Sequence, residues 1–178
     1  MRYAIYGTGG FGREIAPLAV ECTAAEVDGQ DSGIALAEPV LFVDDAPDRS
    51  DKVNGLRVIG FEELVSPDQR DRRVIVAIGD GRSRQRIEEK CAAAGLQMGK
   101  LFARTCRILA ANQIADGAVI CDGVIITANA VIGKSFQANL NSYVAHDCVS
   151  GDYVTFAPGV HLNGNIHVGD YAYIGTGA

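Results

Sequence analysis

The pair His146-Asp147 is the strongest candidate for chemistry in this sequence. An imidazole titrates near physiological pH, so a histidine can take a proton from a nucleophile while a new bond forms. A neighbouring carboxylate fixes the tautomer of the ring and leaves the other nitrogen free to act. The pair therefore predicts a general base at His146 that is supported by Asp147.

Two further histidines and a nearby cysteine suggest other chemistry, which the spacing disfavours. Metal ligands must converge, but His161 and His167 are one six-residue step apart and His146 has a different place in that repeat. We therefore expect no metal site. Cys148 could carry an acyl group as a nucleophile beside His146, yet it falls in a row of small apolar residues, which favours core packing.

A glycine-rich segment near the N-terminus predicts a phosphate-binding turn. Gly7, Gly9 and Gly12 follow a short apolar strand in the pattern Gly-x-Gly-x-x-Gly, which gives a tight turn and bare amides near a phosphate. The acidic pair Asp44-Asp45 lies farther along the chain than the acidic residue of an NAD site would. The motif alone does not define its ligand.

The first part of the chain alternates strands with helices. The apolar runs predict strands at 3–6, 40–43, 58–59 and 74–78, with helices at 10–25, 61–65 and 83–94. Such alternation implies a parallel sheet that is covered by helices on both faces. We therefore expect an α/β domain over residues 1–101.

From about Phe102 the sequence follows a six-residue repeat. Every sixth residue from Ile108 to Ile174 is Ile, Val, Leu or Phe at ten of twelve positions, and a second row four places along is smaller. A period of six fits a parallel β-helix in which three hexads complete one turn. Recurring Gly, Asn and Asp suit the corners of such a coil. The repeat predicts a β-helix over residues 102–178.

The composition limits the partners of the chain. Its 178 residues are 48% hydrophobic and 21% charged, which is typical of a folded protein, and its net charge of −6 argues against nucleic acid and anionic membranes as partners. No apolar run is long enough to span a membrane, and the N-terminus lacks the pattern of a signal peptide. Five cysteines without a Cys-x-x-Cys pair indicate reduced thiols. We expect a cytoplasmic protein.

Taken together, these segments resemble the bacterial nucleotide-sugar N-acetyltransferases and the related sialic acid O-acetyltransferases. The resemblance rests on the Gly7–Gly12 loop, the ends of the strands at Phe42-Val43-Asp44-Asp45 and Ala77-Ile78-Gly79-Asp80, and the hexads around Ala145-His146-Asp147-Cys148. It spans essentially the whole chain. It implies a Rossmann-like domain with a parallel sheet, followed by a left-handed parallel β-helix of hexapeptide repeats.

The resemblance also implies a reaction and the residues around it. The acetyl group of acetyl-CoA would pass to the amine of a nucleotide-linked amino sugar, a 4-amino-4,6-dideoxyhexose, with His146 as the base and Asp147 as its support. The amide of Gly164 would face the thioester oxygen, and the alternative is a corner glycine selected for its torsion angles. Thr155 stands where relatives often have a histidine on the acetyl-CoA side, and Asn139 matches an asparagine near the sugar.

The nucleotide belongs to the N-terminal domain in this family. The resemblance places near it Gly7, Gly9, Gly10, Gly12, Asp44, Asp45, Gly79 and Asp80, with an acidic residue of the Asp44-Asp45 pair bonded to the base. Arg84 follows at the start of the next helix and either meets a phosphate or is one of the solvated charges of that helix.

The resemblance further implies a homotrimer with acetyl-CoA bound between neighbouring subunits, and no metal. Because the chain stops within a hexad at Ala178 without a capping segment, we expect C-terminal coils to be missing, the alternative being that neighbouring subunits cover this end. Two other functions stay open. The same base could serve O-acetylation of a sugar such as sialic acid, or the chain could bind a nucleotide sugar without catalysis.

Overall fold

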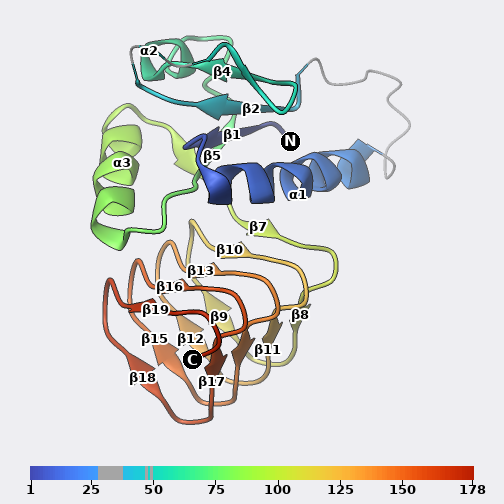
Figure 1. Cartoon of the computed structure of the whole chain (residues 1–178), viewed down its shortest axis with the longest axis vertical. Coiled ribbons are helices and arrows are strands. Elements are labelled where there is room, and N and C mark those ends of the chain that lie inside the picture. The colour runs from blue at the N-terminus through green and yellow to red at the C-terminus, as the bar shows by residue number, and fades with distance from the viewer. Residues whose placement is uncertain (28–37, 47, 49) are drawn as a thin grey trace. The chain divides into compact units, whose positions relative to one another are not determined.

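The computed structural model describes residues 1–27, 38–46, 48 and 50–178 (Figure 1). These residues form two compact units. The first comprises Met1–Ile78 with Ile87–Gly99, and the second comprises Gly79–Arg86 with Lys100–Ala178. The sequence did not suggest that the segment Gly79–Arg86 groups with the second unit.

The first unit is built on a six-stranded sheet in the order β3-β4-β2-β1-β5-β6. The strands are β1 Tyr3–Tyr6, β2 Val40–Val43, β3 Lys52–Val53, β4 Leu56–Ile59, β5 Arg73–Val76 and β6 Gln97–Met98. Every pair is parallel except β3 with β4. The central strands β1 and β2 are buried along their whole length, as expected for near-continuous apolar runs in a parallel sheet. The predicted parallel sheet is confirmed.

The two edge strands were not predicted, because each is only two residues long. Strand β3 pairs with β4 through Asn54 and Gly55, which have φ angles of 49° and 81°. Asn-Gly with two positive φ angles is the preferred two-residue hairpin turn, so this strand had a local signal that hydrophobic patterning overlooks. At the other edge, β6 adds to β5 in parallel.

Among the described residues, three helices accompany the sheet, and their limits lie close to the predicted ones. They are α1 Gly10–Val27, α2 Phe61–Leu64 and α3 Gly81–Ala93. Helix α1 packs on β1 and β2 through buried residues that include Ile15 and Ala19. In the part of the chain that the structure describes, no helix is both long and apolar enough to cross a membrane.

The second unit is a left-handed parallel β-helix, with three sheets of two-residue strands along its walls (Figure 1). One wall contains β7 Leu101–Phe102, β10 Val119–Ile120, β13 Gln137–Ala138, β16 Thr155–Phe156 and β19 Tyr173–Ile174. A second contains β8 Arg107–Ile108, β11 Ile125–Ile126, β14 Tyr143–Val144 and β17 His161–Leu162, and a third contains β9 Gln113–Ile114, β12 Val131–Ile132, β15 Val149–Ser150 and β18 His167–Val168. Paired residues are 18 positions apart, as three hexads per turn require.

The corners of the coil follow the same period. A positive φ occurs at every sixth residue from 111 to 177, at Ala111, Gly117, Gly123, Asn129, Ser135, Asn141, Asp147, Tyr153, Gly159, Asn165, Tyr171 and Gly177. Glycine, asparagine and aspartate tolerate this conformation best, which explains their recurrence in the hexads.

The core of the coil is formed by the two rows that the repeat predicted. Ile120, Ile126 and Val144 of the first row are fully buried, and so are Cys148 and Phe136 of the second. The phenyl rings of Phe136 and Phe156 meet edge to face, with centroids 4.9 Å apart. The expectation that Cys148 packs in the core is confirmed, because its side chain has no exposed surface.

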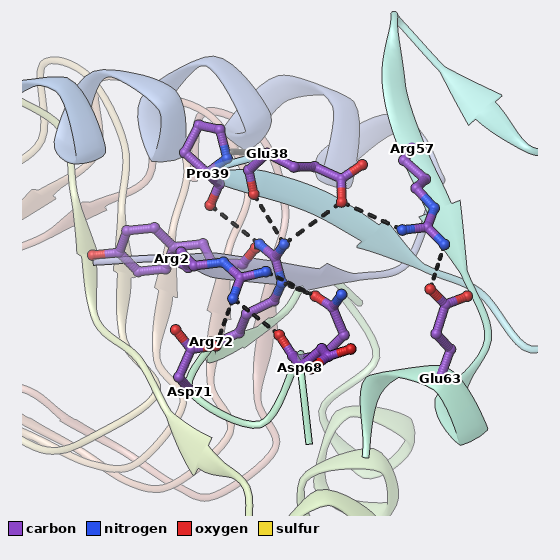
Figure 2. A network of polar contacts seen from close by, with 10 residues as sticks. Arg2, Glu38, Pro39, Arg57, Glu63, Asp68, Asp71 and Arg72 are labelled. Carbon is purple, nitrogen blue, oxygen red and sulfur yellow. Dashed lines mark hydrogen bonds and ion pairs between the residues drawn. The ribbon is translucent and has the colours of Figure 1, made fainter. Parts of the chain in front are cut away.

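Arg72 is a fully buried charge in the first unit. Its guanidinium has no exposed surface and donates to Gln69 Oε1 at 2.6 Å, to the carbonyl of Tyr3 at 3.1 Å and to that of Glu38 at 2.9 Å (Figure 2). Burial and the neighbouring Arg2 charge lower the pKa of Arg72 to about 10, so the group remains charged at neutral pH. The guanidinium thus links Tyr3, Glu38 and Gln69, which are far apart along the chain, through hydrogen bonds.

We expect Arg72→Met to lower the free energy of unfolding of the first unit by about 3 kcal/mol, because it leaves buried carbonyls without a donor. The matched control is Arg57→Met, which removes a half-exposed arginine that pairs with Glu38 and Glu63 (Figure 2). Such surface pairs contribute about 0–1 kcal/mol. Thermal unfolding of both variants gives the comparison, and equal shifts would contradict the role of Arg72.

Candidate active site

The imidazole of His146 lies at a corner of the coil, directly after strand β14. Its side chain is 59% exposed, and its Nδ1 is 2.8 Å from Oδ2 of Asp147. Asp147 occupies the corner position itself, with a φ of 59°. That corner turns the two adjacent side chains toward each other, so the predicted pair is formed in the structure. With Nδ1 bonded to the carboxylate, Nε2 is the nitrogen left to accept a proton.

A third residue, which the sequence analysis missed, completes this group. Asn129 Nδ2 donates to the other carboxylate oxygen of Asp147, Oδ1, at 3.0 Å. Hydrogen bonds from His146 first, and then from Asn129, lower the pKa of Asp147, so the carboxyl group is ionised at neutral pH. Asn129 lies 18 residues before Asp147, one full coil. The spacing of the repeat was the signal that could have identified it.

Gly164 lies against the imidazole on the next coil. A Cβ atom at this position would be 2.6 Å from Cε1 and 2.7 Å from Nε2 of His146. Its φ is not in the positive range, and Asn165 has the corner conformation instead. Gly164 is therefore not a corner glycine selected for its torsion angles, and the role of its amide at the thioester oxygen stays a prediction.

The coil leaves the reactive side of the ring accessible. Ala128 and Gly164 are the residues one coil before and one coil after His146, and both are small. The ladder of backbone hydrogen bonds described for these coils does not use the amide N–H of Gly164. A proton acceptor and a backbone donor therefore lie next to each other on one corner of the coil.

Other chemistry at this corner has no support in the described residues. Cys148 Sγ points inward and donates to the carbonyl of Asn163 at 3.0 Å, so it is not directed at a substrate. No group of three or more His, Cys, Asp or Glu among the residues that the structure describes is arranged to hold a metal ion.

The glycine loop borders a cleft of about 410 Å³ within the first unit. The cleft is lined by Tyr6, Gly7, Thr8, Gly9, Val43, Asp44, Asp45, Ala46, Ile78, Ile87 and Lys90. Gly10 begins α1, and a Cβ at Gly12 would be 2.1 Å from the carbonyl oxygen of Gly7, so Gly12 permits the tight turn. The predicted loop and the predicted acidic pair thus meet at the carboxyl ends of β1 and β2, where ligands bind in open parallel sheets.

Both carboxylates of the acidic pair are held in place. Asp44 accepts a hydrogen bond from Thr8 Oγ1, whereas Asp45 accepts hydrogen bonds from the Tyr6 hydroxyl and from Lys90 Nζ, the latter at 2.7 Å. Partial burial alone would raise the pKa of Asp45, but the bonds from Lys90, Tyr6 and the Phe61 amide outweigh it and lower the pKa. Burial, followed by the bond to Asp45, raises the pKa of Tyr6. No local pattern pointed to Lys90, which is far from Asp45 along the chain.

Two predicted site residues have a different environment from the one expected. Arg84 is fully buried, and its guanidinium donates to the carbonyls of Ser135 and Gly79 and to Thr155 Oγ1, at 3.0–3.2 Å. It therefore neither contacts solvent nor meets a phosphate. Thr155 is also buried, and its hydroxyl donates to the carbonyl of Gly79 at 2.8 Å. Together they fasten the Gly79–Arg86 segment to the wall of the coil.

The remaining predicted residues make local contacts. Asp80 Oδ2 accepts from the amide of Ser83 at 2.8 Å, which caps the start of α3. A hydrogen bond from the Ser83 side chain, and then the one from its amide, lower the pKa of Asp80. Asn139 Nδ2 donates to the carbonyl of Phe156 at 2.8 Å. The positions of Asp80 and Asn139 next to the substrate stay predictions.

The chain is similar to known proteins over its whole length. Residues 2–91 match the family described as the PglD N-terminal domain. A GDP-perosamine N-acetyltransferase of Escherichia coli O157:H7 is 37% identical over 176 residues, which cover 99% of this chain and 76% of that protein.

Solved protein structures are also similar to almost the whole chain. WeeI from Acinetobacter baumannii AYE has a TM-score of 0.86 at 37% identity, over 99% of this chain and 79% of that one. A variant of perosamine N-acetyltransferase from Caulobacter crescentus, in complex with CoA and GDP-perosamine, has a TM-score of 0.82 at 26% identity, over 97% and 76% of the two chains. The chain therefore belongs to the family of bacterial nucleotide-sugar N-acetyltransferases, in which a PglD N-terminal domain precedes a left-handed β-helix.

Proposed function

We propose that this enzyme transfers the acetyl group of acetyl-CoA to the amino group of a nucleotide-linked 4-amino-4,6-dideoxyhexose. The E. coli relative, which matches almost the whole chain, is named for GDP-perosamine, and this favours a GDP-linked sugar. The observation that carries the proposal is the 2.8 Å contact between His146 Nδ1 and Asp147, which leaves Nε2 available beside Gly164.

The proposed mechanism is direct transfer. The lone pair of the sugar amine attacks the thioester carbon, and the nitrogen–carbon bond forms as the carbon–sulfur bond breaks. His146 Nε2 accepts the proton that the amine loses, and the ionised Asp147 stabilises the resulting imidazolium. The amide of Gly164 would donate to the carbonyl oxygen as that oxygen gains negative charge. CoA leaves as the thiolate and takes up the proton from His146.

We assign the nucleotide to the cleft of the first unit. The loop of Gly7, Gly9 and Gly10 offers backbone amides at the start of α1, where a diphosphate is stabilised. Asp44 or Asp45 would accept hydrogen bonds from the base. The Gly79–Asp80 turn and Asn139 stay as predicted neighbours of the substrate.

We also propose a homotrimer in the cytoplasm. Val131 and Val149 are outward-facing neighbours on strands β12 and β15, and they are 41% and 37% exposed. Exposed valines on one flat wall of a coil suit packing against a second copy. A cytoplasmic location fits five cysteines without a Cys-x-x-Cys spacing.

The first test measures thiol release from acetyl-CoA with GDP-, UDP- and dTDP-linked 4-amino sugars and with sialic acid as acceptors. We expect turnover with a GDP-linked amino sugar and a fall of roughly 10²- to 10⁴-fold in His146→Ala, the usual contribution of a general base. His161→Ala, which removes another exposed histidine of the coil, should keep full activity. Turnover of sialic acid alone, or tight nucleotide binding without any turnover, would contradict the proposal.

The second test concerns the space beside the base. Gly164→Ala introduces a methyl group that the imidazole must avoid, and we expect kcat to fall roughly 10- to 100-fold because the reacting groups move apart. Gly169→Ala is the matched control, since a Cβ there has no neighbour within 4 Å. Equal rates for the two variants would show that Gly164 does not set the position of His146.

The third test separates nucleotide binding from chemistry. Asp45→Asn removes the charge that organises Tyr6 and Lys90, so we expect the KM for the nucleotide sugar to rise roughly tenfold, as for one lost charge-assisted hydrogen bond. The kcat and the KM for acetyl-CoA should stay unchanged. Asp51→Asn, an exposed carboxylate outside the cleft, serves as the control. A selective loss of kcat would argue against the assignment.

A further inference from the structure

We propose that Asn129 is a positioning residue of the catalytic base, acting through Asp147 on the imidazole of His146. This inference rests on the proposed function, because it assigns a task to the same site. Asn129 does not contact the imidazole in any hydrogen bond described for the coil. Its side-chain contact is with the carboxylate that holds the ring.

The geometry gives the carboxylate one partner on each oxygen. Asn129 Nδ2 donates to Oδ1 at 3.0 Å, and His146 Nδ1 is 2.8 Å from Oδ2. Rotation of the carboxylate would disturb both contacts at once. The amide of Asn129 therefore fixes the plane of the carboxylate, and that plane fixes the direction of the imidazole.

The backbone makes Asn129 a rigid support. Its own amide donates to the carbonyl of Ala110 at 3.2 Å, and the amide of Asp147 donates to the carbonyl of Ala128 at 3.0 Å. Both corners have nearly the same φ, 58° and 59°. Consecutive coils thus hold the two side chains at a constant separation before substrate arrives.

Such support matters because the pair it serves is exposed. The side chains of His146 and Asp147 are 59% and 46% accessible. The attraction between exposed charged groups is weak, because water screens it and because holding two side chains in one geometry costs entropy. Without a second bond, Asp147 could turn to solvent, and the imidazole would then sample several orientations. Bases that are held in one orientation act more efficiently in proton transfer.

Asparagine could instead be present only because it tolerates the corner conformation. Gly123 and Gly159 occupy other corners at φ angles of 69° and 68°, so glycine satisfies that requirement equally well. Asn129→Gly therefore keeps the corner and removes only the side-chain amide. Asn141→Gly makes the same change at a corner with a φ of 57° that does not contact the His146-Asp147 pair.

The charge environment makes a second variant informative. The corner residues on the coil before, Ala128 and Asn129, and on the coil after, Gly164 and Asn165, have no titratable group. Cys148 is directed into the core, so His146 is the titratable side chain that contacts Asp147. Asn129→Asp would add a second carboxylate here and stabilise the protonated imidazole.

The test combines kinetics with a titration that needs no substrate. We expect Asn129→Gly to lower kcat roughly tenfold with both KM values unchanged, while Asn141→Gly stays within about twofold of the unchanged enzyme. In Asn129→Asp, the midpoint of the His146 titration, followed by NMR of the three histidine rings, should rise by about half a pH unit. The acidic limb of the rate profile should move in the same direction.

The proposal is overturned if Asn129→Gly and Asn141→Gly have equal kcat values, or if the His146 midpoint does not move in Asn129→Asp. Because the NMR titration uses the protein alone, it remains decisive if no acetyl transfer is found or if Asn129→Gly does not fold. A failed acetyl-transfer assay with a shifted titration would reject the proposed reaction and leave the link between Asn129 and His146 intact.

Discussion

The site depends on one backbone constraint, a positive φ at every sixth residue of the coil. This angle closes each corner after a two-residue strand, so residues 18 positions apart become neighbours along the axis of the coil. His146 then lies between Ala128 and Gly164, and Asp147 lies next to Asn129. The residues of the proposed site thus come from separate coils, and the hydrogen bonds of the coil fix their separation. An insertion of a single residue in one hexad would break this alignment, which explains why the repeat keeps its phase.

The features that could be predicted from the sequence are those that a local residue pattern determines. Aliphatic residues at a period of six identified the coil, its core and the inward position of Cys148, and strand–helix alternation identified the parallel sheet of the first unit. His146 and Asp147 are adjacent, so their pairing could be read directly. Asn129 could have been found by looking 18 residues before Asp147, because residues one full coil apart are neighbours. Lys90 meets Asp45 only through the packing of α3 in the first unit, and no spacing along the chain encodes that contact.

Arg84 shows why residue type alone misleads. An arginine at the start of a helix after a glycine turn suggests phosphate binding, yet burial of the guanidinium against carbonyl groups gives it a structural task. Thr155, which departs from the family pattern, accepts one of its hydrogen bonds. A histidine at this position would offer a ring nitrogen with different reach and charge in place of the hydroxyl. Thr155 thus takes part in fastening the Gly79–Arg86 segment to the coil.

Buried and exposed polar groups have opposite tasks in this chain. Arg72 and Arg84 are buried and bonded to several oxygens, which suits groups that hold the chain together. His146 is exposed, and in the proposed mechanism it must stay accessible because an amine and a thioester both have to reach it. An accessible side chain loses the restraint that burial gives, and the coil compensates with hydrogen-bonded neighbours on the adjacent corner. The exposure of the base and the presence of an amide donor on its carboxylate are therefore two consequences of the same requirement.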